Sequence, residues 1–257
     1  VEAIEQRGFS ADPLAEASVS PVSGLLHKYR GRALLVVTGA CAIHCRYCFR
    51  RHFPYGEHIA DWAPALDHVA ADPSIEEVIL SGGDPLVLGD ERLSQLAAAI
   101  TRISHVRRLR IHTRLPIVLP ERIDAAFVDW IGRAPRPVVV LHANHAREID
   151  GSVARAVARL RDAGVTVLNQ AVLLAGVNDS VTALVDLSKT LFEAGIMPYY
   201  LHVLDRVQGA AHFEVPEATA RDLLRSASAE LPGYLVPRLV KEEPGAPSKT
   251  SIDFHSP

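Results

Sequence analysis

The sequence predicts an α/β fold in which a parallel sheet, wrapped by helices, curls into a partial (β/α)6 barrel. Two observations lead to this prediction. Short apolar runs alternate with longer helical patterns along residues 33–204, as in chains built from βα repeats. Polar residues also collect where the apolar runs end, and in barrels of this kind the chemistry lies at the carboxyl ends of the strands. Right-handed crossovers favour the curled form, but the pattern also fits a flat, doubly wound sheet.

Each predicted strand is a compact apolar run of the kind that a buried parallel sheet requires. The runs are Ala33 to Thr38, Glu77 to Ser81, Arg108 to Thr113, Val138 to His142, Thr166 to Leu173 and Pro198 to Leu204. Helical patterns lie between them near residues 62–71, 90–103, 121–132, 150–163 and 180–194. Most of these begin on or near Asp, Ser or Pro, which are common at helix N-termini. A further helix at 216–230 and a short strand at 234–240 follow.

Composition indicates one globular domain preceded by an extended segment. The chain has 257 residues, of which 48% are hydrophobic, and this is enough for one large core. Residues 1–32 are polar and rich in turn signals such as Asp12-Pro13 and Ser20-Pro21. We therefore expect an extended lead-in over residues 1–32 and a single barrel domain over residues 33–257.

Charge and hydropathy argue against two classes of partner. A formal net charge of -3 provides no basic field for nucleic acid, and no apolar run reaches the length of a membrane span. The first residues lack the charged and apolar regions of a secretory signal. A cytoplasmic location is therefore expected.

All three cysteines lie close together, directly after the first predicted strand. Cys41, Cys45 and Cys48 are spaced C-x3-C-x2-C, and three thiolates on such a loop can hold three irons of a four-iron cluster. The fourth iron would stay open to a reactive ligand. A zinc site that adds His44, in an α/β protein without catalysis, is the main alternative. Disulfide pairing is disfavoured because small disulfide-stapled domains carry far more cysteine.

The cysteine spacing, with Tyr47 before the last cysteine, resembles that of the radical S-adenosylmethionine (SAM) enzymes. The segment Phe49-Arg50-Arg51-His52-Phe53 narrows the resemblance to the lysine 2,3-aminomutase group, most closely to the branch that makes β-lysine for elongation factor P. The similarity extends over essentially the whole chain, including residues 110–120 and 198–213. It implies a radical SAM barrel, isomerase activity, and a 4Fe-4S cluster on the three cysteines that cleaves SAM after reduction by an external electron donor.

Polar groups after three of the strands are candidates to bind SAM. In Ser81-Gly82-Gly83-Asp84 the glycines allow backbone to approach a ligand, which leaves carbonyls for an ammonium group. The resemblance implies that this segment holds the amino group of SAM. Asn144, His145 and Gln170 similarly match positions that face SAM in the aminomutases, although isolated polar residues are more often structural.

The resemblance also implies pyridoxal 5'-phosphate (PLP) as a cofactor. Lys28, Tyr29 and Arg32 match the segment that cradles the PLP phosphate, and cations with a phenol suit a dianion. By composition alone, this basic run is a solvated surface. Lys249 matches the lysine that bonds PLP covalently, in a Pro- and Gly-rich tail that composition alone describes as a loop. We therefore expect a C-terminal PLP-lysine segment beside the barrel.

The implied reaction converts L-α-lysine to β-lysine. Arg50 matches the clamp for the substrate carboxylate, and Asp205 and Glu242 match the two ligands of the substrate ε-ammonium. The free-lysine enzymes carry an aspartate in place of Glu242 and a long C-terminal extension that this sequence lacks, which favours the elongation factor P branch. Expected partners are lysine, an electron donor, and elongation factor P or its lysyl-ligase. A radical SAM enzyme of other chemistry, without PLP, remains an alternative.

Overall fold

The centre of the molecule is one sheet of nine strands, which lie side by side in the order of the sequence. The structure is a computed structural model and describes residues 2, 6–57 and 61–254, so residues 1 and 3–5 of the expected lead-in lie outside it. The parallel strands are β2 (Arg32–Thr38), β3 (Glu77–Gly82), β4 (Arg108–Thr113), β5 (Val138–Leu141), β6 (Thr166–Val172), β7 (Met197–His202) and β8 (Arg238–Lys241). Strands β1 (Leu25–Tyr29) and β9 (Thr250–Ser251) pair antiparallel at the two edges.

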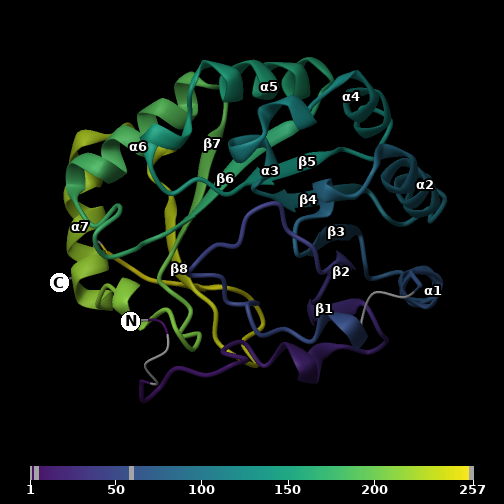
Figure 1. Cartoon of the computed structure of the whole chain (residues 1–257), viewed down its shortest axis with the longest axis horizontal. Coiled ribbons are helices and arrows are strands. Elements are labelled where there is room, and N and C mark those ends of the chain that lie inside the picture. Colours follow the sequence, from purple (N-terminus) through teal and green to yellow (C-terminus); the bar gives the residue numbers. More distant parts are fainter. Residues whose placement is uncertain (1, 3–5, 58–60, 255–257) are drawn as a thin grey trace.

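The helices lie on the outer side of this sheet. Figure 1 shows them in an arc around the strands: α1 (Ala63–Ala71), α2 (Asp90–Thr101), α4 (Ala125–Ile131), α5 (Gly151–Asp162), α6 (Val181–Glu193) and α7 (Glu217–Glu230). The short α3 (Leu115–Val118) follows β4. Within the described chain the edge strands pair only with β2 and β8, so the barrel stays open. This architecture confirms the expected partial barrel. No helix of the described chain combines the length and the apolar character that crossing a membrane requires.

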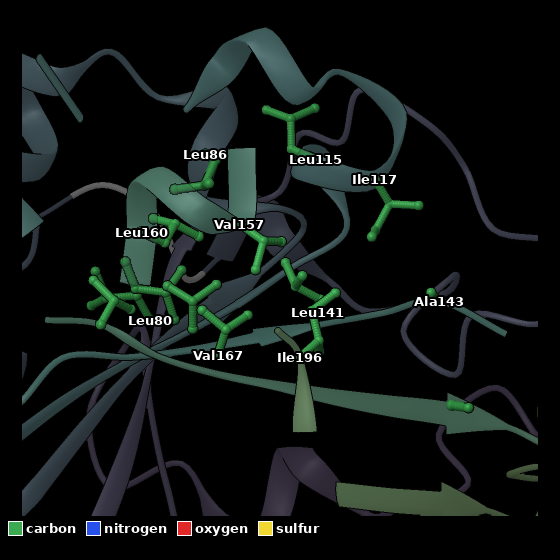
Figure 2. Packing of buried hydrophobic residues seen from close by; sticks show 14 of the residues in the cluster. Leu80, Leu86, Leu115, Ile117, Leu141, Ala143, Val157, Leu160, Val167 and Ile196 are labelled. Atoms are coloured by element: carbon green, nitrogen blue, oxygen red, sulfur yellow. The ribbon is translucent and has the colours of Figure 1, made fainter. Parts of the chain in front are cut away.

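The core lies between the sheet and the helical layer. Figure 2 shows Val157 and Leu160 of α5 facing Leu141 of β5 and Val167 of β6, and all four side chains are almost fully buried. In α5 the buried residues Val153, Ala156, Val157 and Leu160 recur at helical spacing, which puts them on one face. Burying a Val or Leu side chain stabilises a fold by about 1.5–3 kcal/mol. The apolar periodicity of the sequence therefore decides which face of each helix meets the sheet.

The strands and helices expected from the sequence are all present, with ends that differ by a few residues. The start signals of three helices act as caps. Asp124 accepts a hydrogen bond from the Phe127 amide, Asp150 from the amides of Ser152 and Val153, and Ser180 from the Ala183 amide. Such caps are typical of helix N-termini because they satisfy backbone N–H groups that the helix leaves unpaired.

The expectation of an extended lead-in without packed elements is wrong. This segment contains a short 3₁₀ helix, η1 (Glu16–Val19), and strand β1, which pairs with β2. Leu25 and Leu26 are nearly fully buried. Gly31 has a φ of 80° and lies in the turn between the two strands, so the lead-in ends in a hairpin. The expected loop at 244–250 likewise ends in edge strand β9.

Two glycines at the end of β3 bring the chain that leaves β2 close to the sheet. The amide of Gly83 donates to the Thr38 carbonyl at 2.7 Å, and the amide of Asp84 donates to the Ala40 carbonyl at 2.8 Å. A Cβ atom on Gly83 would lie 2.2 Å from the Ala40 carbonyl oxygen. This contact attaches the backbone directly before Cys41 to β3, and it leaves no room for a side chain.

We therefore expect Gly83→Ala to destabilise the protein. The new methyl group must displace the backbone at Ala40, and overpacking of this kind costs about 1–3 kcal/mol. Urea unfolding followed by circular dichroism measures the change in the free energy of unfolding. Gly233→Ala is the matched control, because a Cβ there meets no atom within 4 Å. Equal stability of the two variants would contradict the close approach.

Candidate active site

A cavity of about 950 Å³ lies inside the open barrel, between the strand interiors and the loops that follow them. Its wall contains nearly every residue that the sequence singles out, from both ends of the chain. These are Lys28, Tyr29, Arg32, Cys41, Cys45, Cys48, Arg50, Ser81, Gly82, Gly83, Asp84, Asn144, Gln170, Asp205, Glu242 and Lys249.

His145 is the exception, because it is not part of the cavity wall. The chain turns after Asn144, and the His145 ring instead accepts a hydrogen bond from the Arg147 amide at 3.1 Å through Nδ1. This bond caps the short 3₁₀ helix η5 (Ala146–Glu148). The structure therefore does not bring His145 together with the other candidate SAM residues.

The three cysteines are on one loop, and their side chains line the same cavity. Burial raises the pKa of the Cys41 thiol to about 11, and Asp84 and the two other thiols add to this shift. Burial also raises the pKa of Cys48. Thiols with raised pKa values become thiolates only beside a strong positive charge, and three cysteines on one loop are a donor set that fits the irons of a 4Fe-4S cluster. Among the described residues no three His, Cys, Asp or Glu side chains stand at metal-ligand spacing, with or without His44.

The segment after β3 is attached to the next strand by the Asp84 carboxylate. This buried group accepts hydrogen bonds from the Thr113 hydroxyl at 2.6 Å and from the amides of Leu86, Arg114 and Leu115 at 2.7–3.0 Å. The oxygen atoms of the Asp84 carboxylate thus accept hydrogen bonds from the protein itself. Gly82 and Gly83 also line the cavity, and the Gly82 carbonyl accepts a hydrogen bond from the Tyr55 hydroxyl at 2.9 Å.

Arg50 is buried and paired with a residue that the sequence did not single out. Its Nε and Nη2 atoms each donate to the Glu16 carboxylate at 2.7 Å, and Nη1 donates to the Ser81 hydroxyl at 3.1 Å. Burial by itself would lower the pKa of Arg50, but Glu16 raises it above its usual value. The side chain is therefore a fixed cation with 7% exposure. Only the fold reveals Glu16, because an acid in a polar lead-in looks solvated.

The other end of the cavity is organised by Glu242. Its carboxylate accepts from Lys28 at 2.7 Å and from the Tyr29 hydroxyl at 3.2 Å, and it also binds the Lys249 ammonium. Burial raises the pKa of Tyr29, and Glu242 adds to the effect, so the phenol stays neutral. The Arg32 guanidinium lies 4.5 Å from the centre of the Tyr29 ring. Two ammonium groups thus bind one carboxylate and a guanidinium lies on the adjacent tyrosine ring, which leaves a surplus of positive charge that suits a phosphate group.

Asp205 lies in the same wall and has an unusual pKa. Burial and the nearby Glu242 charge raise the pKa of this carboxyl to about 7, although Lys249 and Lys28 act in the opposite direction. Asp205 is therefore close to half ionised at neutral pH. A substrate ammonium group brought beside it would favour the carboxylate.

Three histidines at strand ends also line the cavity, and the sequence assigned them no role. They are His112 at the end of β4, His142 after β5 and His202 at the end of β7. The Gln170 amide nitrogen is 3.0 Å from His142 Nε2. Burial is the main cause of a low pKa for all three, about 3 for His142, and nearby Arg and Lys cations contribute. These rings are therefore neutral, and they add no charge to the cation-rich wall.

Comparison with solved structures shows which fold this is. The chain is similar to Streptococcus suis SuiB bound to S-adenosylmethionine, with a TM-score of 0.62 and 15% identity over 84% of this chain and 51% of that chain. It is also similar to a radical SAM methyltransferase from Sphaerobacter thermophilus, with a TM-score of 0.53 and 19% identity over 84% and 68% of the two chains. At these identities the likeness concerns the fold, which is that of the radical SAM enzymes.

Comparison of sequences shows the family. Residues 30–112 match the model of a 4Fe-4S single cluster domain. The L-lysine 2,3-aminomutase of Escherichia coli (strain K12) is 53% identical over 251 residues, which are 96% of this chain and 73% of that protein. Identity at this level over most of both chains identifies a shared family, so the chain belongs to the L-lysine 2,3-aminomutase family of isomerases.

Proposed function

We propose that this protein is a lysine 2,3-aminomutase that uses a 4Fe-4S cluster, SAM and PLP to move the amino group of L-α-lysine from C2 to C3. The observation that carries the proposal is the single cavity that brings Cys41, Cys45 and Cys48 together with Arg50 and Lys249. Groups for an iron cluster, a carboxylate and a carbonyl cofactor thus face one space. The name of the E. coli relative supports lysine as the substrate.

The chemistry of the shift would come from the cofactors when they are bound, since SAM on a reduced cluster supplies a radical and PLP supplies a π-system for nitrogen migration. Cys41, Cys45 and Cys48 would hold the cluster. Lys249 would supply the amine that bonds to PLP: its Nζ binds Glu242 in the cavity wall, as that of Lys28 also does, and the resemblance to the aminomutases gives Lys249 the covalent role. Lys28, Tyr29 and Arg32 would receive the phosphate.

Arg50 is suited to hold the substrate carboxylate. A guanidinium group has five N–H donors, and the described contacts of Arg50 use Nε, one N–H of Nη2 and one N–H of Nη1. One N–H on each terminal nitrogen is left, and together they can bind a carboxylate through two hydrogen bonds. The pair with Glu16 fixes the guanidinium at the cavity wall and keeps the cation in place without substrate.

Asp205 and Glu242 are suited to the opposite end of the substrate, the ε-ammonium. The raised pKa of Asp205 favours its neutral form. An incoming ammonium group would stabilise the ionised carboxylate of Asp205 and so gain a charged partner. Glu242 binds Lys28 and Lys249 in the absence of substrate. It would share its carboxylate with the substrate once Lys249 is bonded to PLP.

The direct test is the product of the reaction. The anaerobically reconstituted protein should convert L-lysine to β-lysine only when SAM, PLP and a low-potential reductant are all present, and mass spectrometry of the products would detect it. Cleavage of SAM without β-lysine would favour a radical SAM enzyme of other chemistry. Stoichiometric zinc without iron would favour the non-catalytic alternative and contradict the proposal.

We further propose that the product serves the modification of elongation factor P in the cytoplasm. The support is the resemblance to that branch of the family at residues 49–53 and the longer carboxylate of Glu242. A reducing compartment also protects an oxygen-labile cluster. Competition between free lysine and lysyl-elongation factor P in the same assay would separate the two substrates. The preferred substrate is the one that is consumed first at equal concentration.

For Lys249→Ala we expect loss of the covalent PLP label. Borohydride reduction of the PLP-loaded protein, followed by peptide mass mapping, should place the label on Lys249 in the wild type and on no lysine in the variant. Iron and sulfide content should not change, because the cysteines lie on another loop. Lys241→Ala is the matched control, since Lys241 pairs with Glu217 and Glu243 and does not line the cavity. A label on Lys241 or Lys189 would contradict the assignment.

The pKa of Asp205 predicts a pH dependence of lysine binding. Because that pKa is raised to about 7, the carboxyl is neutral below pH 7 and ionised above it, while the lysine ε-amino group stays protonated up to about pH 10. The KM for lysine should therefore fall as the pH rises through 7. Asp205→Asn should have a higher KM and lose this step, whereas Asp186→Asn, on the exposed face of α6, should keep it. Identical profiles for the wild type and Asp205→Asn would contradict the role.

A further inference from the structure

Arg114 connects the cysteine loop to the ends of β4 and β5. It follows β4 directly, and its amide donates to Asp84 Oδ2 at 2.7 Å, which fixes its backbone position. Its guanidinium Nη1 atom donates to the Sγ atom of Cys45 at 3.6 Å and also to the Tyr47 hydroxyl. The Nη2 atom donates to Glu148 Oε2 at 2.5 Å. One partly buried arginine thus contacts a cluster cysteine, the aromatic residue of the cysteine motif and a carboxylate.

The Arg114 guanidinium is a cation, since arginine side chains stay protonated in proteins, and it forms an ion pair with the Glu148 carboxylate. Tyr47 also accepts from the Asn144 amide at 2.7 Å. The side chain exposures of Arg114 and Glu148 are 17% and 23%, so water screens the pair only in part.

We propose that Arg114 raises the reduction potential of the iron-sulfur cluster held by Cys45, and that Glu148 limits this effect. The inference rests on the proposed function, because it requires the cluster. One-electron reduction adds a negative charge to the cluster, and an adjacent cation that donates an N–H bond to a ligand sulfur stabilises the reduced form. A carboxylate next to that cation opposes it. The electron itself comes from an external low-potential donor.

An electrostatic role and a purely structural role of Arg114 predict different changes in the reduction potential, so an experiment can separate them. Arg114→Gln removes the positive charge and should lower the midpoint potential of the cluster. Glu148→Gln keeps the shape of the side chain, removes the negative charge and should raise the potential. A merely structural role would disturb the cluster site in both variants and would move both potentials in the same direction. Arg114→Lys keeps the cation and should lie between the wild type and Arg114→Gln.

The test is an EPR-monitored redox titration of the anaerobically reconstituted protein, without SAM and lysine, with dithionite as reductant. Signals are normalised to iron and sulfide content. Arg122→Gln is the matched control, because Arg122 forms a similarly buried pair with Asp90 but does not line the cavity, and its potential should equal that of the wild type. A lower potential for Arg114→Gln together with a higher potential for Glu148→Gln supports the proposal.

The remaining outcomes overturn it, and they distinguish this inference from the proposed function. Potentials that stay unchanged, or that shift in the same direction in both variants, contradict the role of Arg114 while the cluster itself remains. Loss of the cluster in Arg114→Gln, together with a wild-type potential in Arg114→Lys and Glu148→Gln, would assign Arg114 to loop structure only. A wild-type chain that binds no iron would contradict the proposed function as well.

Discussion

The arrangement of the cavity depends on the buried carboxylate of Glu242, which joins the two ends of the open barrel. Lys28 and Tyr29 belong to edge strand β1, Lys249 directly precedes edge strand β9, and all three bind this one group. Burial by itself would raise the pKa of Glu242, but the two ammonium groups hold it below its usual value. A buried carboxylate without such partners is costly. The pairing therefore holds the first and last strands at the same cavity, although within the described chain they do not pair with each other.

The charge of the cavity wall depends on which of its side chains are ionised and which are neutral. Arg50 and Arg114 are cations that pair with Glu16 and Glu148. The three histidines stay neutral because burial and nearby cations lower their pKa values. The wall is thus positive where phosphate and carboxylate groups would bind. Asp205, with a raised pKa, is the acid that responds to a further cation.

Most of the secondary structure could be predicted because it depends on local pattern. Apolar runs such as Val138 to His142 contain parallel strands, here β5 (Val138–Leu141), and Asp150 caps the helix that its position predicted. Strand β1 was missed because its burial comes from pairing with β2 and not from its own composition. Glu16 was missed for the same reason, since its partner Arg50 lies 34 positions away. His145 was placed with the site by resemblance, but the turn after Asn144 directs it to a cap.

The sequence by itself determined the chemical groups and the order in which they occur: three cysteines at one spacing, a Gly-Gly pair after a strand, and a lysine in a Pro- and Gly-rich tail. Local pattern suffices for these features because spacing and strand ends are properties of neighbouring residues. Only the tertiary structure decided which groups meet. The contacts of Lys28 with Glu242 and of Arg114 with Cys45 join residues 214 and 69 positions apart. Such contacts depend on the curvature of the whole sheet, and no single stretch of sequence encodes that curvature.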